Sequence, residues 1–312
     1  MNYNELGSTG LSVSELSFGA SSLGGVFHEV DETEAVKAVY RALEAGINYI
    51  DVSPAYGGTK AEQVLGRALK GVPRRQYYLS TKVGKYTDPR SYGSDTFDYT
   101  AERIRRSIGE SMERLGVEYF DIVYLHDFDY EDQAHAESAI TEGYLTLREL
   151  KNEGRIGNVG AGIYAMDLWK RFLLQTDPDV LLVHNHLCLN DIRLLELLPL
   201  AKSKGVGIVN ASPFGSGLLT DRGAPDWHPI TREQRALFSQ AATLCSERGT
   251  SLAKLALQFS SQHHEVPTTL FSTARVSSVD RNLQWYSEPC DYGLVAEVQC
   301  ILEPVMNLQW AY

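Results

Sequence analysis

Strand-like and helix-like segments alternate along the whole chain, and this alternation constrains the fold more than any other feature of the sequence. Short runs rich in β-branched and aromatic residues predict eight strands. These runs span residues 15–21, 47–53, 77–82, 120–126, 156–162, 180–185, 207–212 and 266–272. Eight β/α units without a break in composition favour a closed parallel barrel over an open doubly wound sheet. We therefore predict an α/β fold, one (β/α)8 barrel of TIM-barrel topology, as a single domain over residues 1–312.

The segments between the strands have the apolar and charged faces of helices that cover a sheet. In the clearest case, residues 100–115, apolar residues recur from Ile104 at spacings of 4, 4 and 3, with Thr100 and Gly116 suited to the two ends. Further helices are expected over residues 31–45, 61–70, 142–153, 166–175, 192–203 and 232–247, and from about residue 277. Two additions are expected outside the β/α units: an N-terminal β-hairpin over 2–13 that caps the barrel floor, and an extra C-terminal helix over 294–308.

Composition limits the partners of the chain. Lys plus Arg number 29 and Asp plus Glu number 40, which gives a net charge of −11. Nucleic acids and anionic membrane surfaces bind basic faces, so neither is expected as a partner. No apolar run reaches the roughly 18 residues that span a bilayer, residues 1–10 lack a signal-peptide core, and the 4 cysteines form no C-x-x-C pair. We expect a cytoplasmic protein, a monomer or homodimer, that acts on a small molecule.

Charged residues end three successive predicted strands: Asp51, Lys82 and His126. Because the active site of such a barrel lies at the carboxyl ends of its strands, we expect these side chains at one mouth. Tyr56 follows Asp51 by five residues and is expected to lean over the same mouth. Taken singly, each residue has a structural alternative. Asp51 could cap a helix and Lys82 could be a solvated charge. His126 could be a core histidine and Tyr56 could simply pack in a loop. Their placement on successive strands favours the functional interpretation.

These four residue types suit proton transfer at a carbonyl or hydroxyl oxygen. An unperturbed tyrosine has a pKa of about 10, which is high for acid–base work at neutral pH. A neighbouring ammonium favours the phenolate, so we expect Lys82 to lower the pKa of Tyr56. Asp51 would keep the lysine charged and in place, and His126 would orient the reacting group. The sequence therefore predicts proton movement at an oxygen, coupled to transfer at its carbon.

Five segments resemble the aldo-keto reductase family, and together they extend over essentially the whole chain. They are LGSTGLSVS at 6–14, GINYIDVSPAYG at 46–57, STKVG at 80–84, FDIVYLH at 120–126 and ASPFGSGLLT at 211–220. The resemblance implies a barrel that binds NAD(H) or NADP(H) without a Rossmann fold and transfers hydride at the nicotinamide. It also implies Tyr56 as general acid/base, with Lys82 and Asp51 tuning it and His126 orienting the substrate.

The resemblance further implies a set of cofactor-binding positions. They are Ser212, Phe214, Ser216, Gly217, Leu218, Ser272, Thr273, Arg275, Ser278 and Asn282. Relatives that prefer NADP carry basic residues at the positions of Ser272 and Ser278, where those residues pair with the 2′-phosphate. The two serines therefore favour NAD over NADP, and Arg275 is the one cation that could rescue phosphate binding. Four positions depart from the family's usual nicotinamide contacts: Gly162, Ile163, Leu182 and Ala211.

Within the family, FDYTAER at 97–103, HD at 126–127 and LND at 189–191 resemble the branch of L-galactose and L-fucose (D-threo-aldose) 1-dehydrogenases. This implies oxidation of the anomeric carbon of a sugar to a lactone. Phe27, His28, Asp127 and Phe128 are expected at the mouth as candidates to line a sugar pocket. Two alternatives stay open: an NADPH-dependent reductase of assorted aldehydes, and a cofactor-sensing subunit such as the potassium-channel β subunits of the same superfamily. No ligand pattern supports a metal, and none is expected.

Overall fold

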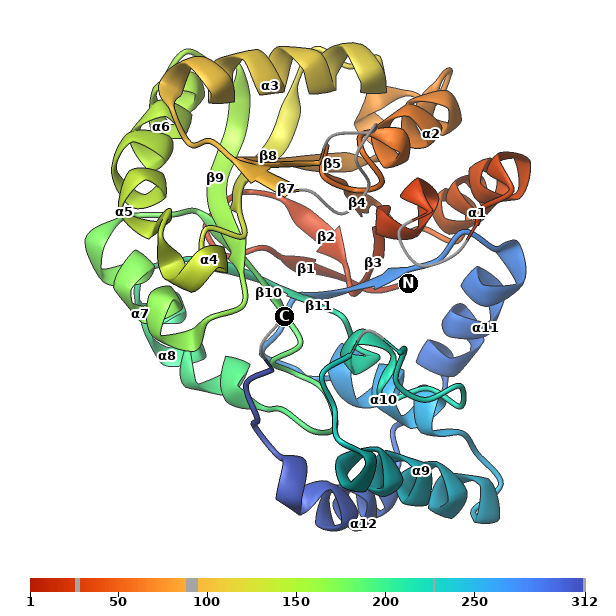
Figure 1. Cartoon of the computed structure of the whole chain (residues 1–312). Helices are drawn as coiled ribbons and strands as arrows, with labels where there is room; N and C mark the ends of the chain where they lie inside the picture. Colours follow the sequence, from red (N-terminus) through yellow and green to blue (C-terminus); the bar gives the residue numbers. More distant parts are fainter. Residues whose placement is uncertain (26–28, 88–94, 227, 311–312) are drawn as a thin grey trace.

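A closed barrel of parallel strands forms the centre of the molecule. The structure is a computed structural model that describes residues 1–25, 29–87, 95–226 and 228–310. The barrel strands are β3 Leu16–Gly19, β4 Tyr49–Asp51, β5 Tyr78–Val83, β8 Phe120–His126, β9 Ile156–Ile163, β10 Val180–His184, β11 Gly207–Ala211 and β12 Thr268–Ser272. They lie in chain order around the barrel, from β3 to β12, and β12 pairs with β3 to close it (Figure 1). Each of the eight predicted strands is present, and the predicted (β/α)8 topology is confirmed.

Helices surround the barrel (Figure 1). The longer ones are α1 Glu32–Glu44, α2 Lys60–Leu69, α3 Ala101–Leu115, α6 Tyr144–Asn152, α7 Met166–Gln175, α8 Leu198–Ser203, α9 Arg232–Glu247, α10 Leu252–Ser261, α11 Val276–Ser287 and α12 Tyr292–Leu302. Short helical segments are η1 Ser21–Gly24, η2 Arg74–Gln76, α4 Tyr130–Gln133, α5 Ala136–Ser138, η3 Ala139–Gly143, η4 Arg193–Glu196, η5 Gly215–Gly217 and η6 Glu303–Val305. In the parts of the chain that the structure describes, no helix combines the length and apolar character needed to cross a membrane.

The ends of α3 follow the sequence signals. The Thr100 side chain accepts a hydrogen bond from the Arg103 amide, and Gly116 ends the helix in the left-handed conformation at φ 68°. The single helix expected over 192–203 is instead divided into η4 and α8. Pro199 lies in the first turn of α8, and because proline has no amide hydrogen, it suits a helix start rather than a helix interior.

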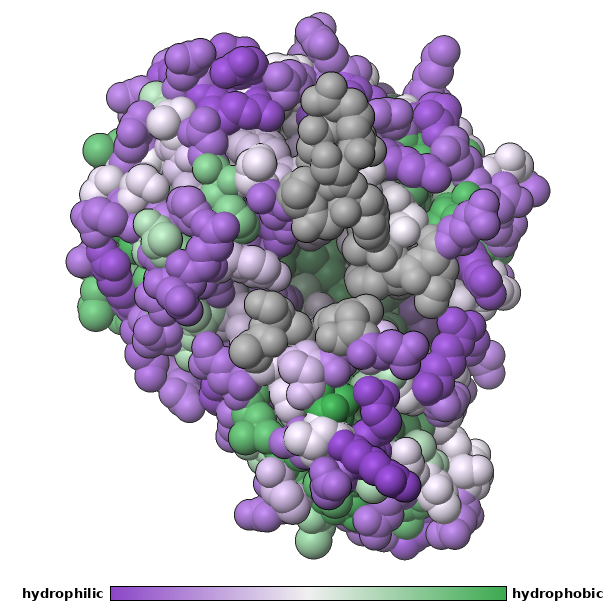
Figure 2. Space-filling view, in the orientation of Figure 1, coloured by the Kyte–Doolittle hydropathy of each residue, from purple (hydrophilic) through white to green (hydrophobic). Residues whose placement is uncertain are grey.

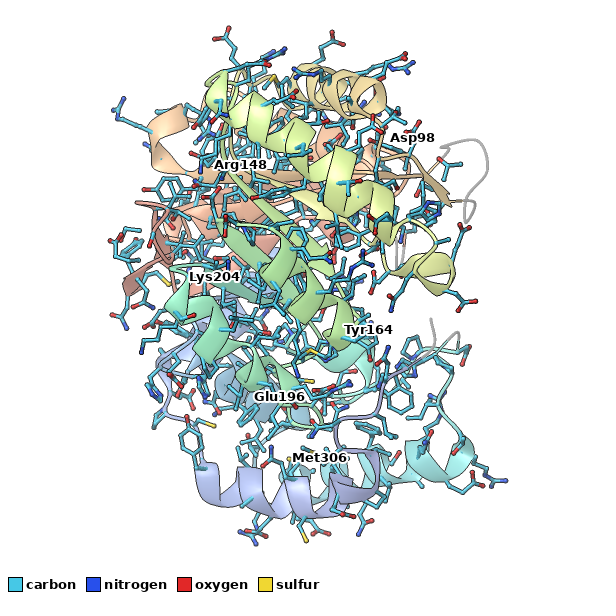
Figure 3. The ribbon with its side chains drawn as sticks, turned by 90° about the vertical axis from the view of Figure 1, so that its left-hand side faces the viewer. Asp98, Arg148, Tyr164, Glu196, Lys204 and Met306 are labelled. Carbon is cyan, nitrogen blue, oxygen red and sulfur yellow. The ribbon has the colours of Figure 1, made fainter. Side chains whose placement is uncertain are left out.

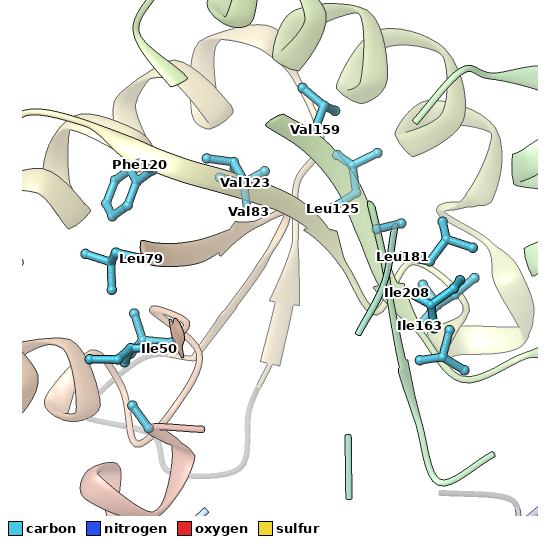
Figure 4. Close-up of a cluster of buried hydrophobic side chains, with 14 of the residues drawn as sticks. Ile50, Leu79, Val83, Phe120, Val123, Leu125, Val159, Ile163, Leu181 and Ile208 are labelled. Atoms are coloured by element: carbon cyan, nitrogen blue, oxygen red, sulfur yellow. The ribbon is translucent and has the colours of Figure 1, made fainter. Parts of the chain in front are cut away.

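Strand side chains alternate between two packing environments, as the period of two in a β-strand requires. Outward-facing residues pack between the strands and the helices; in Figure 4 they include Ile50, Leu79, Val83, Val123, Leu181 and Ile208. Inward-facing apolar residues form a second cluster inside the barrel, including Tyr49, Ile122, Tyr124, Leu182 and Val209. Each strand therefore anchors its outer face in the core, so that inward polar side chains near its carboxyl end are held in fixed positions.

The two ends of the barrel differ. The N-terminal hairpin, β1 Tyr3–Glu5 and β2 Ser12–Ser14, contributes Leu6 and Val13 to the inner cluster, as expected of a floor. A second hairpin, β6 Lys85–Thr87 and β7 Asp95–Phe97, follows β5 and was not predicted, because its strands are three residues long and largely polar. Figure 3 shows Tyr164, which follows β9, near the mouth, and Lys204, which precedes β11, near the opposite end.

Candidate active site

Three ionisable side chains meet inside the barrel mouth from neighbouring strands. Asp51 ends β4, Lys82 lies near the end of β5, and His126 ends β8. Strands β4, β5 and β8 are adjacent, and their register places Asp51 opposite Ser80 and Lys82 opposite Tyr124. All three residues are buried, with exposures of 4%, 1% and 5%. This face of the molecule is hollowed at its centre (Figure 2).

The Lys82 ammonium joins the cluster together. Its Nζ donates hydrogen bonds to the Asp51 carboxylate, to the Tyr56 hydroxyl at 3.0 Å and to the Val52 carbonyl at 3.2 Å. The Tyr56 and His126 rings meet edge to face, with their centroids 5.7 Å apart. The structure thus brings together all four residues that the sequence singled out, although they are up to 75 positions apart along the chain.

The position of Tyr56 depends on a close approach between two loops. Gly57 has φ +63°, and a Cβ built there would lie 2.1 Å from the carbonyl oxygen of Gly24 in η1. A Cβ on Gly24 would lie 2.6 Å from the Tyr56 carbonyl oxygen. Glycine at each position avoids these contacts, and at Gly57 it also adopts the positive φ at little cost. The two glycines therefore let the Tyr56 loop lie directly against η1, so that the phenol reaches Lys82.

Burial and charge act in opposite directions on the acid–base pair. Burial raises the pKa of Tyr56 above its ordinary value and outweighs the effect of Lys82, which lowers that pKa. The net lowering that we expected is therefore not found; the lysine opposes a larger effect of burial. For Lys82 itself, burial alone would lower the pKa, but the neighbouring Asp51 and Tyr56 outweigh burial and raise it. The lysine is therefore an ammonium group at neutral pH.

His126 is held as a neutral imidazole with a defined tautomer. Burial lowers the pKa of His126 to about 3. Its Nε2 lies 3.5 Å from the Asp127 carboxylate, which accepts hydrogen bonds but cannot donate them. We therefore assign the hydrogen to Nε2, and Nδ1 then accepts from the Ser53 hydroxyl at 3.1 Å. The imidazole thus presents an N–H donor in the mouth.

A hydrogen-bonded chain inside the barrel supports Asp51. The Ser80 hydroxyl donates to the second oxygen of this carboxylate at 2.7 Å, and the Tyr49 hydroxyl lies 2.9 Å from both the Ser80 and the Tyr124 hydroxyls. Sequence reasoning missed Ser53 and Ser80. A signal for Ser80 was available, because it precedes Lys82 by two residues on a strand and therefore faces the same side.

The candidate cofactor segment follows β11. Ser212, Gly215, Ser216 and Gly217 all have positive φ, between 54° and 98°. The Asn185 Nδ2 donates to the Ser216 hydroxyl at 2.9 Å, whereas the buried Asn185 Oδ1 has no hydrogen-bond partner among the described residues. Phe214 is half-buried and packs against the main core. Leu218 has a side chain that is 1% exposed, so only its backbone could face a ligand.

The remaining cofactor positions lie between β12 and α11. The Ser272 hydroxyl accepts from the Ser22 amide at 2.9 Å, and the Thr273 hydroxyl accepts from the Arg275 amide at 3.2 Å. Arg275 is exposed at the start of α11, where the Glu34 carboxylate accepts from the Val276 amide at 3.0 Å. Further along the helix, Ser278 is half-buried and Asn282 is buried.

The four substrate candidates have different outcomes. Phe27 and His28 lie outside the described residues. Asp127 lies at the mouth beside His126, as expected. The expectation for Phe128 is wrong, because its side chain is 0% exposed and packs in the core against Phe172, with ring centroids 5.8 Å apart. Its apolar ring is buried beneath α7 instead of facing the mouth.

One protein-family model matches most of the chain. The model described as the aldo/keto reductase family matches residues 15–303, a span that contains all four clustered residues.

The chain belongs to the aldo/keto reductase family.

Individual relatives match nearly the whole length of this aldo/keto reductase. An L-galactose dehydrogenase from Arabidopsis thaliana is 41% identical over 314 residues, which cover 98% of this chain and 95% of the plant protein. A D-threo-aldose 1-dehydrogenase from a Pseudomonas species is 30% identical, with 93% and 94% of the two chains covered. Among solved structures, an aldo-keto reductase from Bacillus halodurans in its holo form has a TM-score of 0.79 and 28% identity, with 96% of each chain covered.

Proposed function

We propose that this aldo/keto reductase is an NAD-dependent sugar 1-dehydrogenase, which oxidises the anomeric carbon of an aldose to the aldonolactone. The observation that carries the proposal is the contact of the Lys82 ammonium with both Asp51 and Tyr56, beside the neutral His126. The similarity to an L-galactose dehydrogenase and a D-threo-aldose 1-dehydrogenase favours a sugar of the L-galactose or L-fucose type.

Each residue of the cluster has a role in this reaction. The His126 Nε2–H orients the anomeric hydroxyl by donating a hydrogen bond to its oxygen, and Tyr56 removes the proton from that oxygen. Lys82 stabilises the phenolate form of Tyr56 against the effect of burial. Asp51, supported by Ser80, holds the lysine in position. A bound oxidised nicotinamide would supply the hydride acceptor.

Two features of the mouth suit the binding of a dinucleotide. The buried Asn185 Oδ1 lacks a partner among the described residues and is an acceptor for a carboxamide or hydroxyl group. The turn from Ser212 to Gly217 contains left-handed residues, and its Gly215 and Gly217 amides already donate to the Ser212 and Phe214 carbonyls, so the Ser216 hydroxyl is the polar group that it would offer to a phosphate oxygen. Asn185 and this turn are therefore the residues that would hold the cofactor, together with the segment between β12 and α11.

The far end of the candidate cofactor site favours NAD over NADP. The Ser272 hydroxyl already accepts a hydrogen bond from the Ser22 amide in η1, and the Glu34 carboxylate accepts one from the Val276 amide at the start of α11. A carboxylate there repels a 2′-phosphate, because like charges at short range disfavour each other. Arg275 is the cation that opposes this effect.

A panel of aldoses tests the proposal. Purified protein is mixed with NAD or NADP and with L-galactose, L-fucose and their stereoisomers, and reduced nicotinamide is followed by absorbance. We expect oxidation of at least one aldose with NAD at a higher kcat/KM than with NADP. Tyr56→Phe should reduce the rate by about 100-fold or more, and the exposed Tyr292→Phe serves as a matched control. A strong NADPH preference with simple aldehydes would favour the aldehyde-reductase alternative, and full activity of Tyr56→Phe would contradict the assigned chemistry.

A further inference from the structure

A second charged cluster lies at the mouth, next to the four residues already described. The Lys85 Nζ, at the start of β6, lies 2.9 Å from an oxygen of Asp127 and 3.2 Å from an oxygen of Asp95 in β7. The same ammonium lies 4.0 Å from the ring centroid of Tyr130. Lys85 and Asp127 are 9% and 8% exposed. Burying such a pair brings little net stability, so its presence in a mouth points to a role toward a ligand.

The backbone of Asp127 directs its carboxylate towards His126. Asp127 has φ +50°, a left-handed conformation that is uncommon for residues other than glycine, and its amide donates to the Gly162 carbonyl at 2.9 Å. In this position Asp127 Oδ2 lies 3.5 Å from the Nε2 of His126. The carboxylate is therefore close to the nitrogen that would orient the reacting oxygen in the proposed function.

The two carboxylate oxygens of Asp127 have different surroundings. Oδ2 takes both the Lys85 and the His126 contacts. Oδ1 has no hydrogen-bond partner in residues 1–25, 29–87, 95–226 and 228–310. Burial would raise the pKa of Asp127, but His126 and Lys85 outweigh burial and hold that pKa well below its usual range. At neutral pH the group is a carboxylate, which accepts hydrogen bonds and donates none.

We propose that Asp127, held by Lys85, binds the hydroxyl on the carbon next to the reacting carbon and so makes the enzyme specific for 2-hydroxylated sugars. This inference rests on the proposed function, because it takes the reacting oxygen to lie on His126. The two oxygens of a vicinal diol lie about a hydrogen-bond length apart. With Oδ2 of Asp127 3.5 Å from His126 Nε2, a diol whose first oxygen contacts His126 can therefore donate from its second hydroxyl to the Asp127 carboxylate, whose Oδ2 is already held by Lys85. The anomeric carbon also bears the ring oxygen, but that oxygen has no hydrogen to donate to a carboxylate. Asp127 therefore selects the C2 hydroxyl.

Removing the C2 hydroxyl from the substrate should be costly for the wild-type enzyme. A site built to hydrogen-bond a substrate hydroxyl rejects an analogue that lacks it, because the buried acceptor is left without a partner. We expect kcat/KM for the 2-deoxy analogue of the best aldose to be lower than for the aldose by roughly 10- to 100-fold.

A two-by-two comparison of substrate and variant tests the proposal. The substrates are the best aldose and its 2-deoxy analogue, and the variant is Asp127→Asn, which keeps the shape of the side chain and tolerates positive φ. We expect Asp127→Asn to lower kcat/KM for the aldose by about 10-fold and to leave the 2-deoxy analogue nearly unchanged, so that the ratio between them collapses. Lys85→Met should act in the same direction, because the carboxylate loses its anchor.

Asp179→Asn is the matched control. Asp179 pairs with Lys151 at 2.7 Å and precedes β10, so it lies at the opposite end of the barrel from the mouth. The Asp179→Asn variant should leave unchanged the ratio of kcat/KM for the aldose to kcat/KM for its 2-deoxy analogue. Thermal unfolding and NAD binding of each variant report whether it is folded. An equal loss with both substrates in folded Asp127→Asn would overturn the inference, since it would mean that Asp127 only positions His126. If the wild type oxidised no aldose at all, the proposed function would fail first, and the inference with it.

Discussion

Replacing Lys82 with methionine removes the ammonium that contacts both Asp51 and Tyr56, while keeping a side chain of similar length. Lys82 is 1% exposed and Asp51 is 4% exposed, so the aspartate would be left as a buried charge whose one remaining side-chain donor among the described residues is the Ser80 hydroxyl. Breaking a buried ion pair from one side costs about 3–5 kcal/mol. We expect a loss of this size in the free energy of unfolding at pH 8.

The loss should depend on pH in a predictable direction. Without Lys82, burial raises the pKa of Asp51 further above its unfolded value, because the main opposing charge is gone. A carboxyl group whose pKa is raised in the folded state destabilises the protein once the pH exceeds about 4, the pKa of this group in the unfolded state. Above that pH the unfolded state loses the proton freely, whereas the folded state must either retain the proton or bury the charge. The stability difference from the wild type should therefore be smaller at pH 5 than at pH 8. Urea unfolding followed by tryptophan fluorescence measures it.

The double variant Lys82→Met/Asp51→Asn separates stability from catalysis. It removes both charges and keeps a side-chain acceptor for Ser80, so most of the lost stability should return. Activity should not return, because Tyr56 would still lack the ammonium that opposes the effect of burial on its pKa. We expect kcat/KM to stay lower than in the wild type by about 100- to 10,000-fold. A single variant that unfolds like the wild type at both pH values, or a double variant with restored activity, would refute this reasoning.

Three further predictions follow from the structure. Burial lowers the pKa of His126 to about 3, so the stability that the neutral imidazole contributes is fully present above pH 6.5 and is lost as the pH falls below that value, at about 1.4 kcal/mol per pH unit. In His126→Gln the free energy of unfolding, measured in urea, should therefore change less between pH 6.5 and 5 than it does in the wild type. Gly57→Ala should displace the Tyr56 loop and lower kcat at least 10-fold, with circular dichroism unchanged, whereas Gly71→Ala, at an open position of similar φ, should affect only stability. Thr100→Ala should cost about 1 kcal/mol in urea unfolding, because α3 loses its N-cap, and Thr100→Ser should restore that loss.

The sequence was most informative where a local pattern has one structural meaning. The runs rich in β-branched and aromatic residues predicted every barrel strand, and Thr100 and Gly116 predicted the ends of α3, because strand composition and helix caps are local signals. The helix α10 and the hairpin of β6 and β7 were missed. The polar, three-residue strands of that hairpin are specified by tertiary contacts, such as that between Lys85 and Asp127, and not by a local pattern.

The residue types, their spacing and their positions at strand ends were enough for the sequence to select Asp51, Tyr56, Lys82 and His126, because all parallel strands of a barrel end at the same mouth. Only the tertiary structure decided the electrostatics of this cluster: desolvation depends on every atom packed around a group, and at Tyr56 it outweighs the neighbouring lysine. The same holds for Phe128, which the chain places one residue after Asp127 and packing turns into the core. Sequence order fixes which strand end carries a residue, whereas the surrounding atoms determine where its side chain points and how strongly its charge is stabilised.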